Sequence, residues 1–154
     1  MYNTLLAIHS LFRWLVLVSL LFAIFRGYQG WLSKKVFSGF DNSVRHWTAT
    51  IAHVQLIVGL WLYFVSPVID YFLHYYKNAV KQSEIRFFGM EHNIMMLLAI
   101  VLITIGSAKA KRKKTDLEKF KTIAIWFTIA LLIILVSIPW PFSSLASRPY
   151  YRGF

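Results

Sequence analysis

The stretch RFFGMEHNIMMLLAIVLITIG (86–106) decides the fold class of this 154-residue chain. It is apolar almost throughout from Phe87 onward, and a helix of about 20 apolar residues is long enough to cross the hydrocarbon core of a bilayer. Pro67, Pro139 and Pro141 stand where such helices are expected to end, because proline lacks the N–H that continues a helix. Three further stretches are equally apolar, so we predict four spanning helices, at about 4–27, 46–66, 87–107 and 121–142.

The composition supports a membrane protein. Hydrophobic residues make up 58% of the chain and charged residues 15%, against roughly 25% charged residues in soluble domains. The connections between the apolar stretches are short, which makes successive helices antiparallel neighbours. We therefore predict an all-α fold, a single domain over 1–154 that forms an up-down four-helix bundle in the bilayer. The chain has no cysteine, which excludes thiol catalysis, disulfides, thiolate-bound haem and iron–sulfur clusters.

The net charge of +11 is unevenly distributed between the predicted loops. One side of the membrane receives eleven basic residues: Arg26, Lys34, Lys35, Arg45, Lys109, Lys111, Arg112, Lys113, Lys114, Lys119 and Lys121. The other side receives five: Lys77, Lys81, Arg86, Arg148 and Arg152. Basic loops favour the cytoplasmic side, so we expect both termini outside. The run KAKRKK (109–114) is interpreted as a topology determinant beside anionic lipid; with no nucleic-acid fold signature, a nucleic-acid partner is not expected.

A few polar residues inside the apolar stretches are the candidate functional residues. An ionisable residue there costs about 2.5–3.5 kcal/mol on insertion scales, so it usually faces the protein interior and has a function. From the helical rise, we place His9 and His92 both roughly 8 Å below the outer boundary and His53 roughly 20 Å below it. The residues concerned are His9, Arg13, His53, Gln55, Glu91 and His92.

Two imidazoles at one depth are what bis-histidine ligation of a haem iron requires, and His9 and His92 meet this condition. Arg13 lies one helical turn after His9, on the same face, and could pair with a haem propionate, with Glu91 or with a quinone oxygen. Met96 lies one turn after His92 and could line the same pocket or serve as a weaker ligand.

Two other interpretations remain open from the residues alone. In a cofactor-free structural or assembly subunit of a larger membrane complex, the polar residues form hydrogen bonds between helices. In a small quinone-binding or transport protein, Arg13 and His53 form the site.

Four blocks in order, HSLFRWL (9–15), AHVQLIVGLWLYFVSP (52–67), EHNIMMLLAIVLITIG (91–106) and IPWPF (138–142), cover most of the chain. Together they resemble a family of small four-helix membrane proteins of Bacteroidetes-type bacteria that are labelled cytochrome b-like. The resemblance implies haem b and electron transfer in the bacterial cytoplasmic membrane, where the outward termini expected from the charge distribution would be periplasmic. We also expect other membrane or respiratory subunits as partners. The resemblance also implies ligand roles at His9, His92 and His53. We therefore expect a one-haem electron-transfer or accessory subunit, rather than a stand-alone enzyme, with Arg13 and Glu91 tuning the iron.

Overall fold

The computed structural model describes residues 1–150, which are helical and contain no strand. The long helices are α1 (Tyr2–Leu32), α2 (Gly39–Val65), α6 (His92–Arg112) and α7 (Asp116–Ser137). Between α2 and α6 lie α3 (Pro67–His74), α4 (Tyr76–Ala79), α5 (Ser83–Arg86) and the π-helix η1 (Phe87–Glu91). The last two continue directly into α6, so a single helical rod runs from Ser83 to Arg112. The prediction of an all-helical chain with four helices long and apolar enough to cross a membrane is confirmed.

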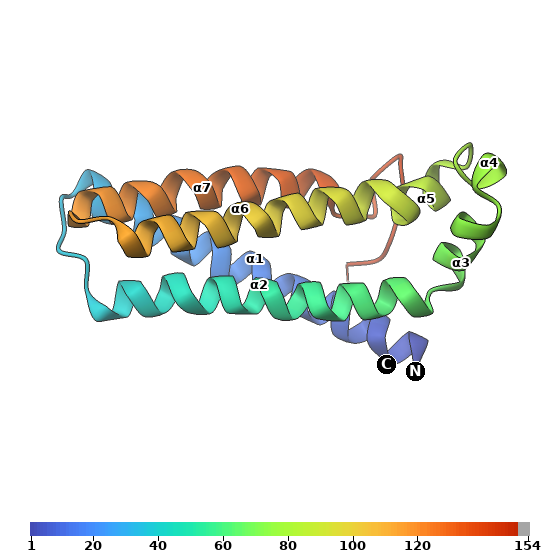
Figure 1. The fold of residues 1–154 in the computed structure, drawn as a ribbon, viewed down its shortest axis with the longest axis horizontal. Coiled ribbons are helices and arrows are strands. Elements are labelled where there is room, and N and C mark those ends of the chain that lie inside the picture. The colour runs from blue at the N-terminus through green and yellow to red at the C-terminus, as the bar shows by residue number, and fades with distance from the viewer. Residues whose placement is uncertain (151–154) are drawn as a thin grey trace.

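The four long helices lie side by side, as Figure 1 shows. Helix α1 packs against α2 and α7, whereas α6 packs against α7 and less extensively against α2. Helices α1 and α6 therefore face each other diagonally across the interior. The N-terminus, the short helices α3–α5 and the segment after α7 gather at one end (Figure 1), which we call the terminal end. The connections 33–38 and 113–115 form the other end, which we call the loop end.

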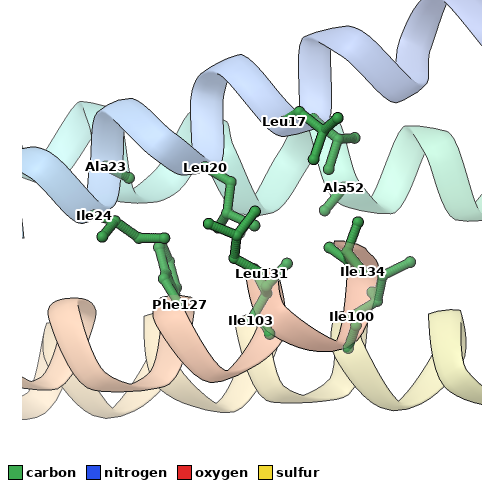
Figure 2. Packing of buried hydrophobic residues seen from close by; sticks show 14 of the residues in the cluster. Leu17, Leu20, Ala23, Ile24, Ala52, Ile100, Ile103, Phe127, Leu131 and Ile134 are labelled. Carbon is green, nitrogen blue, oxygen red and sulfur yellow. The ribbon is translucent and has the colours of Figure 1, made fainter. Parts of the chain in front are cut away.

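A continuous apolar core joins the long helices. Leu20 of α1, Ile103 of α6 and Phe127 of α7 are fully buried, and Figure 2 shows the side chains of α1 pointing across toward α6 and α7. At the loop end α1 and α7 come very close, because a Cβ at Gly30 would lie 2.4 Å from the ring of Phe120. Glycine allows this approach, which a larger residue would prevent.

The outer surface of the helices is also apolar. Val18, Phe64 and Val136 are 65%, 82% and 71% exposed, and many similar side chains surround the long helices. Contiguous apolar surface of this extent is rare on soluble proteins and marks contact with lipid or another protein. The fold is that of a multi-pass membrane protein.

The long helices begin earlier in the chain than the apolar stretches that predicted them. Helix α2 begins at Gly39 because Ser38 and Asp41 form a reciprocal capping box, and α7 begins after Thr115, whose hydroxyl accepts from the N–H of Glu118. Hydropathy does not detect such polar turns, so the predicted starts fall inside the observed helices. The predicted end at 142 instead lies beyond the observed end of α7. Helix α7 ends at Ser137, two residues before Pro139. Arg152, counted in the charge distribution, lies outside the described residues.

Two arginines, Arg26 partly buried and Arg45 buried, link the helices at the loop end. Arg26 of α1 forms an ion pair with Asp41 at 2.6 Å, and Arg45 of α2 donates to the carbonyl oxygen of Ser107 on α6 at 3.2 Å. The side chain of Asp41 is 2% exposed, and Arg45 as a residue is 6% exposed. Both arginines therefore have structural partners inside the protein, although the sequence placed them in a loop.

Candidate functional site

The candidate site is a pair of histidines near the terminal end. His9 of α1 and His92 at the start of α6 have ring centroids 6.4 Å apart, with 70° between the ring planes. Their helices are diagonal neighbours, so the rings meet across the interior of the protein. The contact puts both imidazoles at one level along the helices, whereas their depth in a membrane stays a prediction.

His92 is held by the backbone of α7. Its Nδ1 lies 2.8 Å from the carbonyl oxygen of Ser137. A carbonyl can only accept, so Nδ1 carries the proton, and the lone pair of the neutral ring is on Nε2. The π-helical turn η1 immediately precedes His92, and such turns are frequent at functional sites.

His9 is held against α2. The Nε2 of Gln55 lies 3.1 Å from the carbonyl oxygen of His9 and 3.4 Å from its ring Nε2. An amide NH2 only donates, so the lone pair of the His9 ring is on Nε2 and its proton on Nδ1. One turn further along α2, a Cβ at Gly59 would lie 3.2 Å from Cε1 of His9, so the absence of a side chain there makes room for the ring.

Three polar atoms of this cluster have no hydrogen-bond partner among the described residues. They are Nδ1 of His9, Nε of Arg13 and Oε1 of Gln55, all of them buried. Buried polar groups are almost always paired, and an unpaired one calls for a specific explanation such as a bound ligand, ion or water. Three in one cluster, two donors and one acceptor, mark this as the place where the interior can bind a polar group.

The segment after α7 turns back at the terminal end and contacts α1 (Figure 1). The carbonyl oxygen of Tyr150 accepts from Nη2 of Arg13 and from Nε1 of Trp14, the latter at 3.0 Å. Trp140 packs edge-to-face on Trp14, with ring centroids 6.3 Å apart. Arg148 pairs with Glu84 of α5. The segment therefore connects α1 to α5 at the terminal end.

The other predicted site residues have different surroundings. Glu91 forms an ion pair with Arg86 at 2.6 Å, so it has a charged partner of its own. His53 is exposed, and its Nε2 lies 2.9 Å from the hydroxyl of Thr104 on α6. Met96 is partly buried and packs against the apolar core. The structure thus joins His9, Arg13 and His92 into one cluster and gives Glu91, His53 and Met96 contacts elsewhere.

Three contributors to the cluster were absent from the predicted site. Gln55 was noted as a polar residue in a span but had no role, and Gly59 carried no signal except its position one turn after Gln55. The carbonyl oxygen of Ser137 was not predictable from residue type, because every residue has a backbone carbonyl.

The separation of the two rings is compatible with two imidazoles on one metal ion. An imidazole nitrogen binds a transition metal at about 2 Å, so two imidazoles opposed on one ion have centroids about 6 Å apart. Both rings have the lone pair on Nε2, and His92 has the Nδ1–H to carbonyl bond that orients metal-bound histidines. His9 could bind iron only if its Nε2 lost the 3.4 Å contact with the amide of Gln55. Within residues 1–150 no three His, Asp or Glu side chains form a metal-binding group.

Comparison with known proteins adds no identification: no protein-family model, no curated protein and no solved structure matches the chain.

Proposed function

We propose that this protein is a b-type cytochrome-like electron-transfer subunit of the bacterial cytoplasmic membrane. In this proposal its four long helices form an up-down bundle with both termini outside. The observation that supports it best is the meeting of His9 and His92 at a 6.4 Å centroid separation across diagonal helices.

The residues have distinct roles in this proposal. His92, oriented by the carbonyl of Ser137, and His9 would together hold the haem iron, and His9 would do so through the Nε2 that now contacts Gln55. Arg13 has an unpaired Nε beside the pair, which suits the carboxylate of a haem propionate. Haem supplies reversible one-electron transfer when bound, and the protein supplies ligation, orientation and a low-dielectric surrounding.

The segment 138–150 has a complementary role. It ties Arg13 and Trp14 to residues after α7, so it limits the access of water from the membrane surface to the histidine pair. A dry site raises the strength of each electrostatic contact to a bound group.

A quinol head group is a second candidate ligand, favoured by the unpaired atoms themselves. The N–H groups of His9 and Arg13 suit quinone oxygens, and Oε1 of Gln55 suits a quinol hydroxyl. A quinone recovered stoichiometrically from colourless protein, and lost on Arg13→Gln substitution, would favour this candidate over haem.

The direct experiment is haem quantification on protein purified from cells supplied with a haem precursor. We expect one haem b per chain in the wild type and loss of haem in both His9→Ala and His92→Ala. His74→Ala is the matched control, because His74 is an exposed histidine bound to Asp70. Full haem content in both His9→Ala and His92→Ala would refute the ligand assignment.

A further inference from the structure

A second polar region lies at the loop end, far along the rods from the histidine pair. It is a cavity of about 220 Å³ between the end of α6 and the start of α7. The six residues that line it combine two lysines, one acid, one hydroxyl and two apolar side chains: Lys113, Glu118, Lys121, Thr122, Ile125 and Trp126.

The surroundings of this cavity are strongly basic. Between 107 and 122 the chain has seven lysines and arginines and two acids. Each of the acids already has a lysine partner, Asp116 with Lys119 at 3.6 Å and Glu118 with Lys113 at 3.5 Å. The excess positive charge therefore has no counterpart in the described protein, which favours an anionic ligand.

Aromatic rings hold two of the lysines in place around the cavity. The Nζ of Lys109 lies 4.6 Å from the ring centroid of Trp126, and the Nζ of Lys121 lies 5.5 Å from that of Trp31. Cation–π contacts of this kind restrict long, flexible side chains. Of these two lysines, Lys121 lines the cavity itself, and Lys109 lies over Trp126, which also lines it.

An apolar stripe continues from the cavity along α7. Ile125, Ile129, Leu132 and Val136 recur at helical spacing on one face, with exposures of 38%, 45%, 59% and 71%. From Ile125 to Val136 the stripe is roughly 16 Å long, about half the thickness of a bilayer core. A cationic cavity joined to an apolar stripe of one-leaflet length matches a phospholipid, with its phosphate at the lysines and an acyl chain along α7. A nucleic acid would leave the stripe without a role.

We propose that this cavity binds the head group of an anionic phospholipid. Basic pockets between membrane helices are known to take such head groups. Glu118 lowers the affinity in the native protein, because its carboxylate lines the same cavity as the phosphate. The proposal is independent of the histidine pair, so failure of either leaves the other intact.

The test is titration of the full chain with dioleoyl-phosphatidylglycerol, followed by native mass spectrometry, with dioleoyl-phosphatidylcholine as the zwitterionic comparison. We expect one saturable phosphatidylglycerol site, weakened about ten- to thirty-fold in Lys113→Gln/Lys121→Gln, at about one factor of five per lysine. The control Lys77→Gln/Lys81→Gln removes the same charge at the terminal end and should leave the affinity unchanged. Glu118→Gln should increase it.

Equal affinity of the Lys113→Gln/Lys121→Gln variant and the wild type would overturn the proposal, and so would an equal loss in the terminal-end control. Complete displacement by millimolar inorganic phosphate would show that the cavity takes free phosphate, and this also overturns it. If the double variant does not fold, the single variants Lys121→Gln and Glu118→Gln test the proposal. It requires that the first bind phosphatidylglycerol more weakly than the wild type and the second bind it more tightly.

Discussion

Substitution of Gln55 by leucine tests how the histidine pair is held. The amide of Gln55 donates to the ring Nε2 of His9 at 3.4 Å, the nitrogen that has to bind iron in the proposed function. Gln55 therefore competes with haem for this lone pair, and Gln55→Leu removes the competitor. We expect haem to bind the variant more tightly than it binds the wild type.

The magnitude follows from the length of the contact. A neutral hydrogen bond contributes about 0.5–1.5 kcal/mol, and a long one lies in the lower half of that range, which corresponds to about two- to five-fold in affinity. The free energy of unfolding should change little. The variant also loses the 3.1 Å bond to the His9 carbonyl, but it removes the buried, unpaired Oε1 of Gln55, which costs about 1–3 kcal/mol.

The assay is titration of haem into the purified apoprotein, monitored by absorption. Gln29→Leu is the matched control, because Gln29 accepts a similarly long 3.4 Å bond from Arg26 at the loop end. It should leave haem affinity unchanged. A Gln55→Leu variant that binds haem five-fold or more weakly would refute the reasoning, since Gln55 would then support the bound group instead of competing with it.

Two predictions concern the loop end. Asp41→Ala should lower the free energy of unfolding by about 2–4 kcal/mol, because it removes both the charged partner of the partly buried Arg26 and the capping box of α2; a loss below 1 kcal/mol in denaturant titration would contradict this. Gly30→Ala should destabilise the protein by about 1–3 kcal/mol, because its Cβ would meet the ring of Phe120. Gly39→Ala is the control, since a Cβ there meets nothing within 4 Å, and a thermal melt equal for both glycine variants would be inconsistent with close packing at Gly30.

The fold class was predictable because hydropathy and length act over whole helices. Four apolar stretches identified the four long helices. Helices α2 and α7 begin earlier than predicted because they are capped at Ser38 and Thr115. The common level of His9 and His92 along the helices was predictable from the helical rise. Hydropathy could not show that the helices continue into polar turns, because those turns are stabilised by hydrogen bonds rather than by apolar burial.

The composition of the site was less predictable. Which face of a helix a residue occupies relative to a diagonal neighbour depends on packing, so the separation of Glu91 and His53 from the pair could not be read from spacing. Glu91 has Arg86 as a nearby partner, and His53 faces Thr104 on the exposed side of α2 and α6. The backbone acceptor at Ser137 had no residue signature at all.

The measurement that tests the central claim most directly is low-temperature electron paramagnetic resonance of the oxidised, haem-loaded protein. The account predicts a low-spin signal of bis-imidazole ligation in the wild type. It predicts conversion to a high-spin signal, or loss of haem, in both His9→Ala and His92→Ala. A low-spin bis-imidazole signal that survives in either variant would contradict the account, because iron would then have ligands other than this pair.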